Sequence, residues 1–329
     1  MKKIYLWLSM MLIFVCAGKA QTNLYSNNFD ALTVGGYAAS QLGTPWTTWS
    51  NAPGGSEDGI ISSTQSHSAS NSVEIALNND FVMNLNDKTT GRYKVEFYMY
   101  VATGHIGYYN ILSDFNGSNS KWAFQIYAYD GNIYVDAGGA SATISIFTLN
   151  TWNKMDLIVD LDDDFATFFI NDIEKISYQW SKGAQGSDNS LKLDAIDFFG
   201  IDSLSTPTTT TSTSGYFIDD ISIDELTAPV APSNLVATYS STTGNIDVTW
   251  TAPTTAPDLY KLSRNGNVIY SGASNSYTDV GPWPNNYGYA ARAFFTGQGY
   301  SHSSNVDSAK VPGGVTRDLV LMEGGTGTW

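Results

Sequence analysis

Hydrophobic and polar residues alternate with a period of two along most of the chain. The alternation is clearest in residues 93–101, 122–128 and 155–161. Successive side chains of a β-strand point to opposite faces of a sheet, so this pattern predicts half-buried strands. Turn residues at 130–132 and an acidic turn at 162–164 connect these strands to the next ones. No segment shows a sustained helical period, and the chain is therefore predicted to be all-β.

Many short strands with turns at close intervals are typical of β-sandwiches. Pro229 and Pro232 interrupt the strand pattern, and 42% of the residues are hydrophobic, enough for more than one core. We therefore predict two domains, at residues 24–226 and 230–312. The low-complexity run at 205–215 is interpreted as a long surface loop inside the first domain, because a strand-like segment follows it.

The first domain resembles a known family of sandwiches. Its successive segments FYMYV, GYYNILSDF, WAFQIY, WNKMDLIVDLDDDFATFFIND and YFIDDISI resemble the concanavalin A-like, laminin G-type jelly rolls of secreted bacterial proteins. The resemblance covers residues 24–226. It implies two packed antiparallel sheets, a fold commonly used to bind glycans or surface partners.

The second domain resembles a fibronectin type III module, an immunoglobulin-like sandwich. The segment IDVTW supplies a core tryptophan, Trp250, and a hairpin surrounds Asn265 and Gly266. Tyr287 occupies the tyrosine-corner position of such sandwiches. The resemblance implies a spacer or an interaction platform, so no chemistry is assigned to this domain.

The N-terminus has the form of a secretory signal peptide. Lys2 and Lys3 precede an apolar run, and the small residues Gly18 and Ala20 come just before a predicted cleavage site, which makes residues 1–20 the signal. The apolar run is too short to cross a bilayer, which takes about 20 residues. We expect secretion to the periplasm, the outer-membrane surface or the medium, with no transmembrane span after cleavage.

Charge and cysteine content exclude several classes of function. Cleavage of the signal would remove three lysines and no acid, changing the net charge from −15 to −18. Nucleic acid is therefore not an expected partner. The one cysteine, Cys16, would leave with the signal, so disulfides, thiol catalysis and cysteine-bound metals are not expected in the mature residues given.

The last residues, 313–329, contain the segment RDLVLMEGGTGTW. This segment resembles the start of a thioredoxin-like domain in a family of outer-membrane-associated bacterial proteins. In that family such a strand leads into a Cys-x-x-Cys motif. The resemblance implies that the chain is a fragment that stops before a redox domain, and that its two sandwiches are accessories to that domain.

Two groups of aspartates are candidate calcium ligands. Asp30 lies near the start of the first domain, and Asp219 and Asp220 lie on its last strand. In jelly rolls the first and last strands are neighbours. Their carboxylates are predicted to converge on a structural Ca²⁺. The alternative is that they accept hydrogen bonds from a nearby turn. The acidic run 160–164 lacks the glycine and glutamate of a calcium loop and is interpreted as a solvated hairpin turn.

Five polar or aromatic residues are candidates for ligand binding. They point away from the apolar sides of their strands: Tyr98, Tyr100, Gln125, Tyr127 and Tyr129. Flat rings beside hydrogen-bonding groups suit sugars, which present C–H patches next to hydroxyls. Tyrosine is also simply a good strand former, so structural exposure is the alternative. We predict one glycan-binding face made of these side chains.

Catalysis has less support in the sequence. The three histidines lack metal-ligand spacing, and the usual nucleophile-elbow and phosphate-loop motifs are absent. The Glu-x-Asp-x-x-Glu strand of jelly-roll hydrolases is also absent, and the nearest string, 194–197, has no glutamate. We expect a secreted, non-enzymatic binding protein for a glycan or cell-surface partner. A redox-domain accessory is the second hypothesis and a glycoside hydrolase the third.

Overall fold

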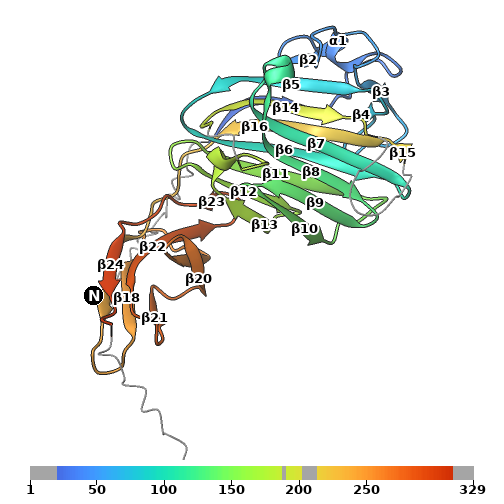
Figure 1. Ribbon diagram of the computed structural model, residues 1–329. Coiled ribbons are helices and arrows are strands. Elements are labelled where there is room, and N and C mark those ends of the chain that lie inside the picture. The colour runs from blue at the N-terminus through green and yellow to red at the C-terminus, as the bar shows by residue number, and fades with distance from the viewer. Residues whose placement is uncertain (1–20, 187–189, 202–212, 314–329) are drawn as a thin grey trace, which may run out of the picture.

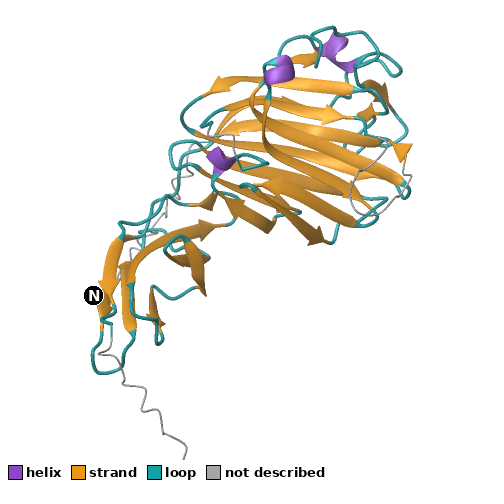
Figure 2. Cartoon of the chain, viewed as in Figure 1, coloured by secondary structure: helices purple, strands orange, loops and turns teal. Residues whose placement is uncertain are grey.

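The structure, a computed structural model, describes residues 21–186, 190–201 and 213–313. The predicted signal peptide, most of the low-complexity run and residues 314–329 of the predicted thioredoxin-like start lie outside these ranges. The described residues form two β-sandwiches joined near residue 230 (Figure 1). Strands make up nearly all the regular structure (Figure 2), which confirms the all-β prediction.

The first sandwich has two eight-stranded sheets, which we call sheet A and sheet B. Sheet A has this strand order, with β1 (Thr22–Asn27) beside β16: β13 (Ile173–Tyr178), β12 (Phe165–Ile170), β11 (Trp152–Asp160), β6 (Arg92–Val101), β16 (Tyr216–Glu225), β4 (Ser72–Ile75) and β3 (Ile60–Ser62). Sheet B has this order, with the short β15 (Thr213–Ser214) beside β7: β10 (Ala140–Ser145), β9 (Asn132–Ala137), β8 (Lys121–Tyr129), β7 (His105–Asp114), β14 (Leu193–Phe199), β5 (Asp80–Lys88) and β2 (Trp46–Thr48). Three single-turn helices lie in connections: α1 (Ala38–Leu42), η1 (Gly117–Asn119) and η2 (Trp180–Lys182).

The core of this sandwich lies between the inner faces of the two sheets. On β6, Val95, Phe97 and Met99 are fully buried, as their alternation predicts. The ring of Phe97 meets two rings of sheet B, Tyr109 at 4.9 Å and Phe198 at 5.1 Å between centroids. Each such buried aromatic side chain stabilises the fold by about 1.5–3 kcal/mol. The alternate residues of β6 are therefore left on the outer face of sheet A.

The second sandwich packs a three-stranded sheet on a five-stranded one. The strands are β17 (Ser233–Tyr239), β18 (Ile246–Thr251) and β21 (Ser276–Asp279) in the first, and β20 (Asn267–Gly272), β19 (Leu259–Arg264), β22 (Asn286–Phe295), β23 (Gly299–Tyr300) and β24 (Asp307–Lys310) in the second. Trp250 is buried in this core. The Tyr287 hydroxyl donates to the Trp283 carbonyl at 3.0 Å, which confirms the predicted tyrosine corner.

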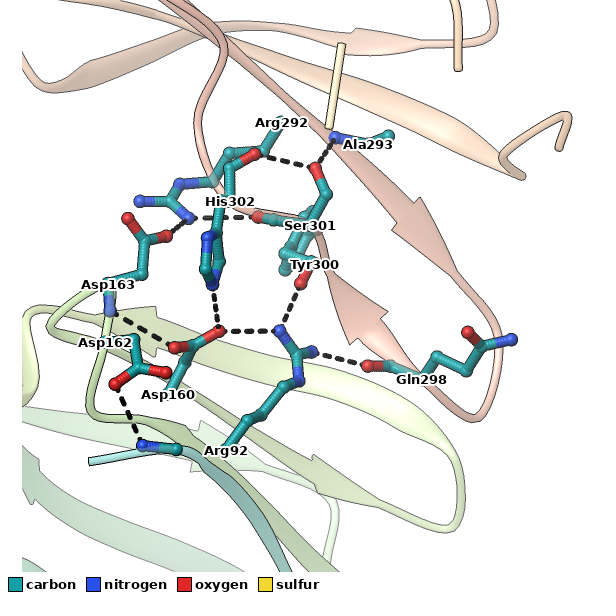
Figure 3. A network of polar contacts seen from close by, with 11 residues as sticks. Arg92, Asp160, Asp162, Asp163, Arg292, Ala293, Gln298, Tyr300, Ser301 and His302 are labelled. Carbon is teal, nitrogen blue, oxygen red and sulfur yellow. Dashed lines mark hydrogen bonds and ion pairs between the residues drawn. The ribbon is translucent and has the colours of Figure 1, made fainter. Parts of the chain in front are cut away.

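A buried arginine connects the two sandwiches (Figure 3). Arg92 on β6 is only 4% exposed and donates to Asp160 Oδ2 at 2.9 Å. The same guanidinium donates to the carbonyls of Gln298 at 2.5 Å and Tyr300 at 2.6 Å in the second sandwich. His302 Nε2 lies 3.1 Å from Asp160 Oδ2. One carboxylate therefore contacts a cation of its own sandwich and an imidazole of the other.

The acidic run 160–164 forms part of this interface, so the prediction of a solvated turn is wrong for Asp160 and Asp163, whereas Asp162 is exposed. Asp160 is 2% exposed, and Asp163 forms an ion pair with Arg292 of β22. Aromatic rings extend the contact, with Phe169 of β12 lying 6.1 Å from Phe294. Figure 1 shows β22 and β23 next to β12 at this junction. These contacts hold the second sandwich against sheet A.

Candidate functional site

The predicted tyrosine face is divided between the two sheets. Tyr98 and Tyr100 lie on β6 of sheet A, whereas Gln125, Tyr127 and Tyr129 lie on β8 of sheet B. All five point away from the core, but the outer faces of two packed sheets lie on opposite sides of a sandwich. The prediction of one shared face is therefore wrong. Alternation along a strand tells which side chains face outward, and a sandwich has two outward faces.

A continuous row of polar side chains crosses the outer face of sheet B. Gln125 donates to Asp136 Oδ2 at 2.6 Å and accepts from the Tyr108 hydroxyl at 3.0 Å. Asn110 donates to the Tyr108 hydroxyl at 3.3 Å and to Asp197 Oδ2 at 2.6 Å. We call the whole set the polar row: Ser141, Asp136, Gln125, Tyr108, Asn110, Asp197 and Asp80. It crosses six neighbouring strands, from β10 to β5.

Strand register explains why these residues meet. Asn110 of β7 lies directly opposite Gln125 on one side and Asp197 of β14 on the other. Gln125 lies opposite Asp136, which lies opposite Ser141 on β10 and accepts a hydrogen bond from its hydroxyl. Residues directly opposite in antiparallel strands have Cβ atoms about 4.5–5.5 Å apart, close enough for side-chain hydrogen bonds. The register therefore builds the row, and no single-strand pattern could have shown it.

Two carboxyl groups meet at one end of the polar row. Asp80 and Asp197 are hydrogen-bonded to each other, and burial raises the pKa of both, that of Asp80 to about 6. Asp197 is only 3% exposed. Among the described residues, Oδ1 of each carboxyl has no other partner. Two carboxylates this close favour sharing one proton. The direct contact also differs from the separation of about 5–9.5 Å between the two carboxyls of glycosidases.

Aromatic rings flank the polar row at the β8–β9 end. Tyr127 is half-buried, and its ring centroid lies 4.9 Å from that of Tyr108. Tyr129 is buried and stacks on the half-buried Tyr134 of β9 at 4.8 Å. Of the predicted tyrosines on this strand, only Tyr127 therefore presents a ring to solvent. Tyr134, which was not predicted from the sequence, is the second ring on this face that solvent reaches.

A second aromatic group flanks the row near β5 and β14. Trp49 lies 6.1 Å from Trp122 and 5.3 Å from Phe115, and all three are half-buried. They cover a small apolar cluster on the outer face: Val82, Leu112 and Ala195. The alternation in 122–128 predicts Trp122 on the inner face. A register shift at Ala123 turns it outward instead, because the bulge adds one residue to the strand.

The predicted calcium ligands lie on neighbouring strands, as expected, because β1 pairs with β16. Their oxygens, however, bind the backbone of the segment 67–71. Asp219 Oδ2 accepts the N–H groups of His67 at 2.8 Å and Ser68 at 3.2 Å. Asp30 Oδ1 accepts the N–H groups of Ser70 at 2.8 Å and Asn71 at 3.0 Å.

The carboxylate of Asp30 and those of Asp219 and Asp220 therefore do not converge on one point. Backbone hydrogen bonds from Ser70 and Asn71 lower the pKa of Asp30, whereas burial raises that of Asp219 to about 6. Asp220 contacts the ring of His67 rather than Asp30. In the part of the chain that the structure describes, no group of three or more His, Cys, Asp or Glu side chains could hold a metal ion. The prediction that these carboxylates converge is therefore wrong, and calcium binding itself stays a prediction.

Within the same described ranges, no helix is long and apolar enough to cross a membrane.

The sequence matches no family model and no curated protein. Solved structures with a similar fold include an alginate lyase in complex with an alginate tetrasaccharide, at 12% identity over 64% of this chain and 99% of that one (TM-score 0.40). They include the Caenorhabditis elegans galectin LEC-6, at 9% identity over 46% and 94% (TM-score 0.31). A fibronectin type III-like protein from Clostridium thermocellum matches 26% of this chain and 96% of its own at 24% identity (TM-score 0.24).

A sialidase also matches, at 12% identity and a TM-score of 0.37, but the chain spans only 18% of its length. At these identities the likeness extends to the fold alone. The first domain is a jelly-roll-like sandwich and the second is a fibronectin-like sandwich.

Proposed function

We propose that the first sandwich binds a neutral or basic glycan on the outer face of sheet B. The observation that supports this is the polar row, which lies between two groups of aromatic rings, most of them half-buried. Binding sites for small molecules typically combine apolar and aromatic walls with a few placed hydrogen-bonding groups. The face has both, over six adjacent strands.

The chemistry of a pyranose fits this arrangement. Its C–H patch packs on a flat ring, and Tyr127 and Tyr134 present such rings beside the row. Its hydroxyls are donors and acceptors, and the row offers the half-buried carboxylate of Asp136 next to those rings. Gln125, which is only 7% exposed, donates to Asp136 and so orients that carboxylate before the ligand arrives.

Charge selects the class of glycan. The chain carries a net charge of −15, and three members of the polar row are aspartates. Uronic-acid or sulfated chains would bring like charge to this face, whereas neutral and amino sugars would not. With the export signal that the sequence predicts, this face would meet polysaccharides outside the cytoplasm.

Binding rather than hydrolysis is the function proposed. A glycosidase places two carboxyls on either side of the scissile bond, about 5–9.5 Å apart. Asp80, half-buried, and Asp197, buried, are hydrogen-bonded to each other, an arrangement unlike that of a glycosidase pair. The second sandwich, fixed by Arg92, would hold this face in a constant orientation to the rest of the chain.

A glycan array tests the proposal. The purified chain is applied to neutral, amino and uronic oligosaccharides, with Trp283→Ala as a matched variant, since Trp283 is an 84% exposed aromatic residue on the other sandwich. We expect both proteins to bind neutral or amino sugars and to release no reducing ends from them. Binding to uronic chains alone, or to none, would overturn the proposal.

A further inference from the structure

A groove of about 610 Å³ lies on the opposite side of the first sandwich, on the outer face of sheet A. It runs beside β1 and β16, and its lining includes six side chains with polar or aromatic groups: Asn27, Asn28, His67, Glu96, Tyr98 and Asp220. We call it the His67 groove. Its volume is within the range of about 300–1,000 Å³ that small-molecule sites occupy.

A stacked pair of rings forms one wall of the groove. The His67 ring lies 3.5 Å from the Tyr98 ring, at an interplanar angle of 14°. Trp152 lies edge-on at 5.9 Å, and Tyr100 lies 5.6 Å from Trp152. The His67 side chain is still 33% exposed, so the stack presents part of its surface to the groove.

The stack is held in place by hydrogen bonds to Asp219 and Asp220. The His67 N–H donates to Asp219 at 2.8 Å, and Nδ1 lies 2.6 Å from Asp220 Oδ2. The contact uses one ring nitrogen, and the described residues supply no hydrogen-bond partner to the other, Nε2. A histidine oriented in this way is available to a ligand hydroxyl without further ordering.

Carboxylates and amides complete the lining. Glu96 and Asp220 are each 23% exposed, and Lys154 lies 3.3 Å from Glu96, so that part of the acidic charge is balanced. Asn27 uses its side-chain oxygen to accept the Phe29 N–H. Its side-chain NH₂ hydrogen-bonds to Tyr25 and has a second hydrogen to donate beside two carboxylate acceptors, the combination that a pair of sugar hydroxyls requires.

We infer that the His67 groove is a second saccharide site, for an uncharged pyranose, independent of the face on sheet B. The ligand class rests on the proposed function, whereas the residues that form the groove are separate from those of the face on sheet B. Uncharged sugars are favoured because Glu96 and Asp220 line the groove, and the lysines beside Glu96, Lys94 and Lys154, are already paired with carboxylates. The hydrogen bonds of the segment 67–71 thus orient a ligand-binding ring as well as closing the edge of the sheet.

Two sites on opposite sides of one sandwich have a consequence for binding. Packed sheets are about 10 Å apart, and side chains on both outer faces add to this separation. One glycan chain cannot lie on both faces without passing around an edge, so the protein would bridge two separate chains. Linked sites of this kind raise the overall affinity for a polymer without a new contact.

The test blocks each site separately. Ala31 is exposed and lines the groove, so Ala31→Trp fills the groove without removing any of the side-chain hydrogen bonds described above for its walls. Val34→Trp is the matched control, because Val34 is 51% exposed in the same connection and is not among the groove-lining residues. The double variant Tyr127→Ala with Tyr134→Ala removes the rings of sheet B.

Native mass spectrometry counts the cello-, manno- or chitohexaose molecules bound per chain, and turbidity reports cross-linking of the matching soluble polymer. We expect two molecules on the wild type and on Val34→Trp, one on Ala31→Trp, one on the sheet B variant, and cross-linking only by the first two. Two molecules on Ala31→Trp would overturn the second site and leave the proposed function intact. Two on the sheet B variant would overturn the proposed function instead. A wild type that binds none of the probes would overturn both.

Discussion

Replacing Asp197 by asparagine should make the first sandwich more stable at high pH. The carboxyls of Asp80 and Asp197 share a proton because burial raises both pKa values. The unfolded chain releases that proton near pH 4, so folding is linked to proton uptake. Stability from this pair is therefore highest below the unfolded pKa and falls as pH rises towards the folded pKa. In the variant, the new NH₂ group donates to Asp80, and the pair no longer needs the proton.

The magnitude follows from the proton that the pair shares. Burial, and not Asp197, raises the pKa of Asp80 to about 6, so that shift remains in the variant and cancels in the difference. What the variant avoids is the loss of the shared proton at high pH, which leaves a buried acceptor without its donor at a cost of about 1–3 kcal/mol. Asp197→Asn should gain this amount over wild type above pH 7 and lose the advantage at pH 4. Asp156 and Asp219, whose pKa values burial also raises, contribute equally to both proteins and cancel in the difference.

Calorimetry at pH 4, 6 and 8 measures the difference in melting temperature of the larger domain. A gain of about 1–3 kcal/mol corresponds to about 2–12 °C for a domain of this size. Asp194→Asn is the control on the same strand, since its carboxylate accepts the N–H groups of Asp87 and Phe115. That variant should melt lower than wild type at pH 8. A difference between Asp197→Asn and wild type that stays constant with pH would refute the shared proton.

Three further predictions concern the interface, the aspartates and the second sandwich. Arg92→Met leaves Asp160 buried without its cation, which typically costs about 3–5 kcal/mol; small-angle scattering should show the two sandwiches reorienting, and an unchanged profile would argue against a fixed junction. The calcium site predicted from the sequence requires millimolar calcium to raise the melting temperature above that in EDTA; because Asp30 and Asp219 already accept backbone N–H groups, equal melting temperatures would count against the site. Tyr287→Phe removes the bond to Trp283 and should cost about 1 kcal/mol, seen as a lower melting temperature of the second sandwich alone.

The strands and their buried faces could be predicted because burial imposes a local pattern. Residues 93–101 alternate so regularly that β6 and its inward side chains follow from the sequence, and Tyr287 followed from the resemblance of its strand to a fibronectin type III module. The pairing of β1 with β16 also followed, from the resemblance to jelly rolls. In each case the information lies within one segment or in a known topology.

The site required information that no single segment contains. Whether two strands belong to the same sheet depends on topology, so Tyr98 and Tyr127 could not be assigned to opposite faces from alternation. Asp80 and Asp197 meet only because β5 and β14 are neighbours, although 117 residues separate them in the chain. Asp30 was predicted to bind calcium because the first and last strands of a jelly roll are neighbours, and the sequence does not show that backbone N–H groups of 67–71 occupy its carboxylate.

The affinity of a neutral oligosaccharide for the double variant Tyr127→Ala and Tyr134→Ala tests the central claim most directly. Titration calorimetry compares this variant with wild type and with Trp283→Ala, using the hexasaccharide that binds best on the array and the Ala31→Trp background to isolate sheet B. The account predicts at least a tenfold weaker affinity, about 1.4 kcal/mol, for the double variant and no change for Trp283→Ala. Equal affinity in all three proteins, with the fold intact by circular dichroism, would contradict it.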